Sequence, residues 1–280
     1  MKKLLSLLAV ATLLVCVCCA CNSAPKTAKV IEIDLTQEEY AFGVDKAQPE
    51  LLTKVNAFVK KIMDDGTFDD ICNNYFGDGT PVAVKSAAYD ASKDQLVVAT
   101  NAAFEPFEYK DGDSYYGIDM EIAALLAKEL NMELVINNMD FDAVCLTVGQ
   151  HKADIAMAGL TVKEERKEHV TFSDTYYYAS QRIIVAEGDD TFAECDTADK
   201  ILAKLQTMDN TTSIGYQNGT TGAMYVANEG DYASNNLKVT GKGYKNGSLA
   251  VQDLLNGNID YVVIDSAPAA CIVKAINALA

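Results

Sequence analysis

The segment from Leu96 to Asp174 decides the fold, and its most informative parts read LVVATNAAFEPFEY (96–109), YYGIDMEIAALLAKEL (115–130), MDFDAV (139–144) and DIAMAGLTVKEERKEHVTFSD (154–174). The apolar start predicts a buried strand. Apolar residues then recur every four positions from Ile118 to Leu130, as in a helix with one apolar stripe. Shorter strands are expected at 134–137 and 154–157, with a helix at 142–150 between them. This alternation predicts an α/β layer with a mostly parallel sheet.

A second series of the same kind begins near Gln181 with QRIIVAEG. It continues with a helix at 198–205, the strand SIGYQ, and the turn NGTTG that opens another helix. The strand IDYVVID ends at Asp265, and a final helix is expected after Pro268. Two α/β lobes of ordinary domain size are therefore predicted.

The N-terminus is typical of a targeting segment. Residues 1–20 hold two lysines, a short apolar run and a small residue before Cys21, which indicates a signal peptide. The start of the mature chain, CNS, resembles a bacterial lipoprotein site, although Cys18 stands where such sites usually carry leucine. We expect acylation of Cys21, a polar tether over 21–28, and a location on the outer face of the cell membrane. Plain secretion and an uncleaved anchor are the alternatives.

Composition excludes several classes of partner. The net charge of −17 disfavours binding to nucleic acid or to anionic membrane surfaces, because both require clustered lysine and arginine. The membrane is therefore expected to be met only through the lipid. Four cysteines lie in the body of the chain without CxxC spacing, and the sequence does not decide whether they form disulfides: Cys72, Cys145, Cys195 and Cys271.

Motifs for catalysis and for metal binding are absent from the sequence. The two histidines, His151 and His169, stand in polar surroundings, and neither HExxH nor GxSxG occurs. The glycine-rich stretch at 241–247 lacks the lysine and hydroxyl residue that end a phosphate-binding loop. Carboxylates are plentiful, so their number leaves a catalytic pair open, but no context marks one out. We therefore predict no catalytic residue, no metal site and no cofactor.

Several residues match the needs of a small zwitterion. Arg166 can hold a carboxylate with two hydrogen bonds, and Thr161 stands where a strand ends and a helix begins. Asp265 ends a strand and can accept from an ammonium. Each type also has a plain structural use as surface charge, helix cap or core residue, so the pattern alone does not decide. The remaining candidates are two hydroxyls at a helix start and two aromatic walls: Thr220, Thr221, Phe104 and Phe141.

These stretches closely resemble the extracellular solute-binding proteins of family 3, the amino-acid receptors of ABC importers. ATNAAFEPFEY, GIDMEIAALLAKEL, MDFDAV, AGLTVKEER and TFSDTYYY match the first lobe, whereas NGTTGAMYV and GSLAVQDLLNGNIDYVVID match the second. The resemblance implies a two-lobed, periplasmic-binding-protein-like fold of type II with the ligand cleft between the lobes. It also implies a monomer that binds a free L-amino acid and meets a permease.

The resemblance assigns roles within the cleft. The ligand carboxylate is expected at Arg166, Thr161 and Thr221. Asp265 and the carbonyl of Gly159, beside Ala158, are expected to hold the ammonium. Phe104 and Phe141 match the aromatic walls.

The order of the segments departs from the family. QEEYAFGVDKAQPELLTKVNAFVKKIMDDGTFDDICNNYF (37–76) resembles the closing segment of these proteins but stands near the start of this chain. We therefore expect a circular permutation, tolerated where old ends lie close together. The expected parts are lobe 2 (29–38 and 181–280), lobe 1 (39–180), and a linker (77–94) that joins the old ends.

Two amides favour a neutral polar ligand. Relatives that bind lysine or arginine carry aspartate where Asn101 stands, and Gln217 is expected to face the same space. An unpaired ligand charge would be costly to bury there, so glutamine or a similar amino acid is favoured. Asp119 keeps a cationic ligand open. Some relatives dehydrate prephenate-like or arogenate-like acids, so an enzyme on the same fold is the other alternative, but no motif residue supplies its general acid.

Overall fold

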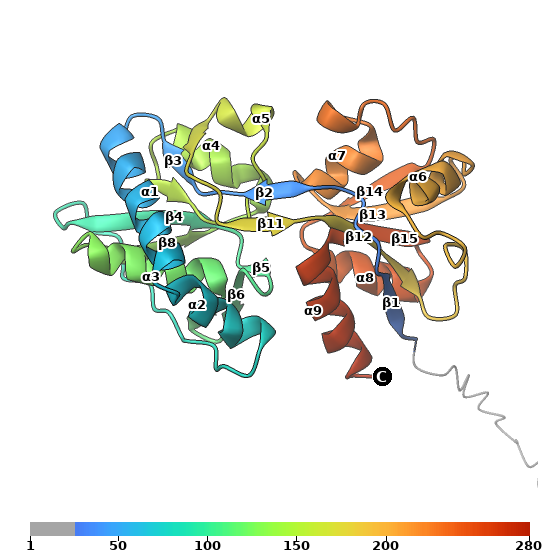
Figure 1. Cartoon of the computed structure of the whole chain (residues 1–280), viewed down its shortest axis with the longest axis horizontal. Coiled ribbons are helices and arrows are strands. Elements are labelled where there is room, and N and C mark those ends of the chain that lie inside the picture. Colours follow the sequence, from blue (N-terminus) through green and yellow to red (C-terminus); the bar gives the residue numbers. More distant parts are fainter. Residues whose placement is uncertain (1–25) are drawn as a thin grey trace, which may run out of the picture.

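The computed structural model describes residues 26–280 and consists of two α/β lobes side by side (Figure 1). The predicted signal peptide (1–20), Cys21 and most of the predicted tether lie outside the described residues. Lobe 1 and lobe 2 are defined below by their sheets.

Lobe 2 is built on a five-stranded sheet in the order β1–β12–β15–β13–β14. Its strands are β1 (Ala28–Ile31), β12 (Gln181–Ala186), β15 (Tyr261–Asp265), β13 (Ser213–Gln217) and β14 (Thr240–Tyr244). Its helices are α6 (Ala198–Gln206), α7 (Thr221–Ala227), η2 (Gly230–Tyr232), α8 (Gly247–Asn256) and α9 (Ser266–Asn277).

Lobe 1 is built on a second five-stranded sheet in the order β10–β3–β9–β4–β8. Its strands are β10 (Val170–Phe172), β3 (Gly43–Asp45), β9 (Ile155–Ala156), β4 (Gln95–Thr100) and β8 (Glu133–Asn138). A three-stranded sheet adds β5 (Ala103–Phe104), β6 (Glu108–Asp111) and β7 (Ser114–Tyr116). Its helices are α1 (Pro49–Asp64), α2 (Thr67–Phe76), α3 (Ile118–Glu129), η1 (Phe141–Ala143), α4 (Val144–Gly149) and α5 (Glu164–Lys167).

The sheets are mixed, so the prediction of mostly parallel sheets was wrong. In lobe 1, β4 pairs parallel with β8 and β9, whereas β3 pairs antiparallel with β9 and β10. In lobe 2, β13 pairs parallel with β14 and β15, whereas β12 pairs antiparallel with β1 and β15. The antiparallel pairs involve the strands next to the connections between the lobes, and the strand–helix alternation does not reveal them.

Two antiparallel strands, β2 (Glu38–Tyr40) and β11 (Tyr177–Ala179), run side by side between the lobes (Figure 1). The chain changes sheets between β2 and β3, which are separated only by Ala41 and Phe42. The two inward residues of β2 therefore lie at the junction of the lobes.

The segment from 37 to 76 packs within lobe 1. β3 lies inside the sheet, between β10 and β9, and α1 buries an apolar stripe that includes Val55 and Ile62. β1, in contrast, pairs with β12 in the lobe 2 sheet. The amide and carbonyl of Ala28 both bond to the side chain of Asn277, so β1 lies beside the end of α9 (Figure 1).

The stretch from 77 to 94 is irregular but attached to lobe 1. Val84 forms a bridge with Tyr115, and the amide of Ala87 donates to the carbonyl of Leu134. Glu121 of α3 accepts hydrogen bonds from the hydroxyl of Tyr75 and the amide of Val82, one on each side of the turn that follows α2. The stretch thus lies along α3 and β8.

Gly117 allows α3 to start close to the strand that carries Glu108. Its φ is +121°, and a Cβ at this position would lie 2.1 Å from the carbonyl oxygen of Phe107. Only glycine permits this approach, since any side chain would meet the backbone. The contact places Asp119, two residues later, beside the β5–β6 hairpin.

None of the helices between residues 26 and 280 combines the length and apolar character that crossing a bilayer requires. Within the same residues the four cysteines Cys72, Cys145, Cys195 and Cys271 are all free thiols. The described fold therefore depends on packing and hydrogen bonds, with no disulfide among these four.

Candidate functional site

The predicted residues gather where the two lobes meet. Asn101 follows β4 and Thr161 follows β9 in lobe 1, while Gln217 ends β13 and Asp265 ends β15 in lobe 2. All four are buried. The amide of Gln217 donates to Asn101 Oδ1 (2.9 Å) across the junction, so residues more than 100 positions apart are in contact.

Arg166 lies at the centre of this junction with 7% of its surface exposed. Its guanidinium donates to the carbonyl of Thr161 (2.7 Å) and, across the lobes, to the carbonyl of Gly219 (3.0 Å). The ring of Phe141 lies 5.2 Å from its Cζ. In the described part of the chain both hydrogen bonds go to neutral carbonyls, so the buried positive charge has no anionic partner and several of its five N–H groups stay free.

Asp265 supplies a carboxyl group to the same junction and is 4% exposed. It accepts a hydrogen bond from the hydroxyl of Tyr40, a neutral phenol of β2. Burial raises the pKa of Asp265 to about 7, and the nearby Glu38 carboxylate acts in the same direction, while hydrogen bonds from Tyr40 and Gln181 oppose it. A cation next to Asp265 would relieve this cost.

A chain of hydroxyl groups links the lobes. Thr221 Oγ1 of lobe 2 donates to Thr161 Oγ1 of lobe 1 (3.2 Å), and Thr161 Oγ1 lies 2.6 Å from Glu38 Oε2. A carboxylate only accepts, and a hydroxyl has one proton, so Thr161 donates to Glu38. This differs from the sequence expectation that the Thr161 hydroxyl donates to a ligand carboxylate, because its proton is already used.

Thr220 is the N-cap of α7 and uses its hydroxyl locally. Its Oγ1 donates to the carbonyl of Gln217 (2.8 Å) and accepts from the amide of Ala223 (3.3 Å). The hydroxyl predicted to face a ligand is therefore occupied by the start of its own helix.

The two amides share their hydrogen bonds. Asn101 Nδ2 donates to the carbonyl of Met139 (2.6 Å) while its oxygen accepts from Gln217. Gln217 Oε1 is buried without a hydrogen-bond partner in residues 26–280. An unpaired acceptor of this kind costs roughly 1–3 kcal/mol unless a ligand donates to it.

Gly159 and Ala158 are buried beside the predicted aromatic wall. The φ of Gly159 is +54°, and a Cβ there would lie 3.0 Å from the ring of Phe104 and 3.2 Å from that of Tyr40. The amide of Gly159 donates to Asp119 Oδ2 (2.9 Å), and the hydroxyl of Tyr176 donates to Asp119 Oδ1 (2.7 Å). Asp119 therefore fixes the strand-to-helix turn, with each oxygen bonded.

Sequence reasoning missed Glu108. This residue is fully buried and directly opposite Phe104 in the β5–β6 pair, so the two side chains share a face. Neither carboxyl oxygen has a hydrogen-bond partner in the part of the chain that is described. Burial raises the pKa of Glu108 well above its ordinary value, and Asp119 and Asp265 add to the shift. The signal was present in FEPFEY, where the polar residue stands between two aromatic ones.

Glu38 and Tyr40 were also missed as site residues. Both alternate inward on β2, with Glu39 exposed between them, a pattern that the sequence EEY already carries. The sequence placed them only at the boundary between the expected lobes, because their position in the chain is far from the other site residues.

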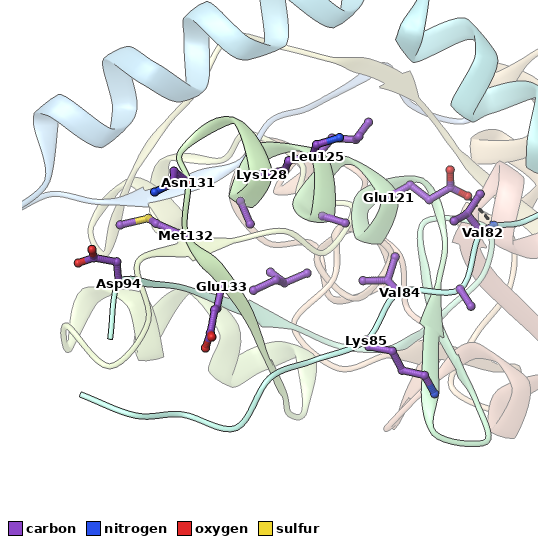
Figure 2. A pocket seen from close by; sticks show the side chains of 14 residues that line it. Val82, Val84, Lys85, Asp94, Glu121, Leu125, Lys128, Asn131, Met132 and Glu133 are labelled. Carbon is purple, nitrogen blue, oxygen red and sulfur yellow. Dashed lines mark hydrogen bonds between the residues drawn. The ribbon is translucent and has the colours of Figure 1, made fainter. Parts of the chain in front are cut away.

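A separate groove lies on lobe 1, away from these residues. It has a volume of about 710 Å³ and is lined by α3, β8 and the stretch at 82–85. Val84, Leu125 and Met132 are among its apolar walls (Figure 2). None of the predicted site residues lines it. The groove is separate from the charged junction described above.

Comparison with known proteins fits this geometry. A family model described as "Bacterial extracellular solute-binding proteins, family 3" matches residues 96–265. The chain belongs to this family. The matched range contains Arg166, Asp265 and the two amides, and it begins after the segment that supplies Glu38 and Tyr40.

Two curated relatives of this solute-binding protein carry names of amino-acid receptors. The arginine-binding extracellular protein ArtP of Bacillus subtilis is 35% identical over 105 residues, which is 38% of this chain and 41% of ArtP. A probable histidine-binding protein of Neisseria gonorrhoeae is 30% identical over 193 residues, 68% of this chain and 66% of the relative. The chain thus spans about two fifths to just under two thirds of their lengths.

Solved structures agree on the two-lobed fold. An ancestral arginine-binding protein, solved with arginine and with glutamine, gives TM-scores of 0.55 and 0.54 at 34% and 35% identity, with 65% of this chain and 75% and 74% of the other covered. An ancestral amino acid-binding protein, AncCDT-1, described as a precursor of cyclohexadienyl dehydratase, gives 0.56 at 30% identity with 65% and 75% covered.

The buried acids make the stability of the unliganded protein depend on pH. Burial raises the pKa of Asp119 and of Asp265 to about 7 from an ordinary 3.8. Between these values the native state holds more protons than the unfolded state, so the free energy of unfolding should fall as the pH rises from 5 to 7. Each acid that is protonated in the native state and ionised in the unfolded state lowers the free energy of unfolding by about 1.4 kcal/mol per pH unit. Urea unfolding at both pH values measures this fall.

The matched variants are Asp265→Asn, which should flatten the fall, and Asp111→Asn on the exposed part of β6, which should leave it unchanged. A stability that stays level or rises over this range in the unsubstituted protein would contradict the assignment of protonated acids to the junction.

Proposed function

We propose that this protein is an extracytoplasmic receptor that binds one free amino acid between its lobes and delivers it to the permease of an ABC importer. The observation that carries the proposal is the buried pair of Arg166 and the Asp265 carboxyl group at the junction. Among the described residues Arg166 has no anionic partner, and Asp265 accepts from the neutral phenol of Tyr40. A zwitterion supplies the anion that Arg166 lacks and a cation that would favour the ionised form of Asp265.

The geometry supports an order of contacts along the ligand. Arg166 would bind the carboxylate through its free N–H groups. Asp265, the carbonyl of Gly159 and the lone pairs of Thr161 Oγ1 would accept from the ammonium, since the proton of that hydroxyl is donated to Glu38. The backbone bridge between Tyr40 and Thr161 holds these groups in one place.

A neutral polar side chain such as that of glutamine is supported by the two amides. Gln217 Oε1 has no partner among the described residues and would accept from a ligand amide. An ancestral arginine-binding protein of the same fold was solved with glutamine. This remains the ligand class indicated by Asn101.

A cationic side chain is supported by a different observation, the two unpaired oxygens of Glu108. Glu108 shares a face with the expected wall Phe104, and a guanidinium or ammonium there would make the ionised carboxylate favourable. The name of ArtP points the same way. We favour a cationic amino acid over glutamine because a buried acid without any bond needs more compensation than an amide oxygen.

An enzyme on the same fold is the second candidate function. The general acid that no motif supplied is available in principle, because the pKa of Asp119 is raised to about 7 by burial and that of Glu108 also lies well above its ordinary value. The name of AncCDT-1 connects the fold to a dehydratase. We favour the receptor because Asp119 is bonded at both oxygens to groups of the protein itself.

We also infer that the chain is a circular permutation of the family arrangement. The family match begins at residue 96, and the matched solved structures align with only 65% of the chain. Yet β3, from outside the matched range, lies in the middle of the lobe 1 sheet. This is the pattern expected when an integral part of a lobe has moved along the sequence.

The lipid anchor at Cys21 belongs to the same proposal. Acylation there would attach the receptor to the membrane through the residues that precede β1. The tether would therefore join the protein at lobe 2. Lobe 1 would not be tethered directly and could move toward lobe 2.

The first test is a thermal-shift screen with the twenty amino acids, followed by calorimetric titration of the strongest hit. A ligand at about 100 times its dissociation constant should raise stability by roughly 2.7 kcal/mol. Arginine or lysine is the expected hit. Glu108→Gln should lower the affinity for that amino acid at least tenfold, while the affinity for glutamine changes little. A hit with glutamine alone would contradict the cationic ligand and favour a neutral polar one. Turnover of prephenate without any amino-acid binding would favour the enzyme.

The permutation is tested by moving residues 29–76 to follow Ala280, with 77–94 deleted. Since β1 already lies beside the end of α9, the rearranged chain should fold and bind the same hit within about threefold of the original affinity. A rearranged chain that is soluble but has lost the circular-dichroism spectrum of the original would argue against the inference.

The anchor is tested by partition between water and detergent after expression in bacteria. The full chain should enter the detergent phase, and Cys21→Ser should remain in water if acylation is the anchor. Equal partition of both chains would exclude acylation at Cys21.

A further inference from the structure

The side chain of Glu38 links the strands that connect the lobes to the candidate ligand site. It is 3% exposed and lies on β2, one of the two strands that run between the lobes. Its Oε1 accepts from Thr36 Oγ1 (2.7 Å) and from Gln181 Nε2 (3.0 Å), and its Oε2 accepts from Thr161 Oγ1 (2.6 Å). Three donors from three separate segments thus converge on one buried carboxylate.

These bonds explain how two acids remain close together. Glu38 and Asp265 are near enough for Glu38 to raise the pKa of Asp265, and the phenols of Tyr40 and Tyr232 face the same region. The three hydrogen bonds compensate Glu38 without a basic partner. An apolar side chain at position 38 would leave these three donors unpaired, so the carboxylate and its partners form one unit.

The position of one proton gives Glu38 a specific role. Thr161 can donate only once, and Glu38 takes that proton, which leaves the oxygen of Thr161 as an acceptor. The oxygen already receives the hydroxyl of Thr221 from the other lobe (3.2 Å). A hydroxyl oriented in this way attracts an ammonium and does not donate to a carboxylate.

We propose that Glu38 is a positioning residue that orients the Thr161 hydroxyl to accept from the ammonium of the bound amino acid, an inference that rests on the proposed receptor function. Because Glu38 also bonds Thr36, before β2, and Gln181, after β11, it ties that hydroxyl to both connections between the lobes. Glutamine at position 38 presents one oxygen and one NH₂ group. It can satisfy Thr161 or the other two donors, but not all three.

The experiment uses the full chain, Glu38→Gln, and two probes that differ only in the α-amino group. L-arginine and 5-guanidinopentanoic acid are titrated calorimetrically, or L-glutamine and its des-amino counterpart 4-carbamoylbutanoic acid if the unsubstituted protein prefers glutamine. Glu38→Gln should weaken binding of the amino acid at least tenfold and binding of the des-amino probe less than twofold. Glu39→Gln, the exposed neighbour on the same strand, should change neither.

A double-mutant cycle with Thr161→Val separates positioning from general damage. In the Thr161→Val background, Glu38→Gln should lower the affinity for the amino acid by less than a further threefold, because the hydroxyl that Glu38 orients is absent. Glu38→Asp, which keeps the charge but is too short to reach Thr161, serves if Glu38→Gln does not fold, and should show the same selective loss.

Three results would overturn the inference. Amino-acid binding by Glu38→Gln at the affinity of the unsubstituted protein would show that the orientation is not needed. Equal weakening of both probes, together with a lower unfolding temperature, would show a structural role only. Additive losses in the cycle would disconnect Glu38 from Thr161. Failure of the unsubstituted protein to bind any amino acid would instead remove the receptor function itself, and this inference with it.

Discussion

A buried guanidinium without an anionic partner is the constraint on which the rest of the junction depends. Arg166 has been taken out of water, a transfer that costs several kcal/mol, and in the described chain it bonds only to two carbonyls. Those carbonyls belong to different lobes, so the guanidinium makes both hydrogen bonds only when the two lobes are in contact. The ring of Phe141 lies 5.2 Å from its Cζ, close enough for a favourable cation–π contact.

The acidic wall complements that charge. Asp119, Asp265, Glu38 and Glu108 are all buried near the aromatic side chains of β2 and of the β5–β6 hairpin. Their electrostatic repulsion is relieved in different ways. Asp119 and Glu38 accept two and three hydrogen bonds, Asp265 accepts from Tyr40, and Glu108 is left with its pKa well above the ordinary value. Among the described residues, these acids thus range from two whose oxygens all accept hydrogen bonds to Glu108, whose oxygens accept none.

The sequence allowed the lobes, the family and most of the candidate site to be predicted, because those features are local. A strand that ends at Asp265, or a helix stripe beginning at Ile118, depends on neighbours within a few residues. The mixed sheets, the hydrogen bond from Thr161 to Glu38 and the bond between Tyr40 and Asp265 join residues far apart in the chain. No periodicity records such contacts. Glu108 lay inside a quoted motif and was missed because its burial, and not its spacing, makes it unusual.

The pairing of β1 with β12 has a consequence for the order of folding. Residues 38 to 179, from β2 to β11, hold every strand of the lobe 1 sheet, so that sheet can be completed without any strand of lobe 2. β1 must wait for β12, and its partner Ala186 emerges 158 residues after Ala28. Contacts of such long range form late, because the loop must close before the pairing is rewarded. We therefore expect the sheet of lobe 1 to be complete while β1 still presents an open strand edge.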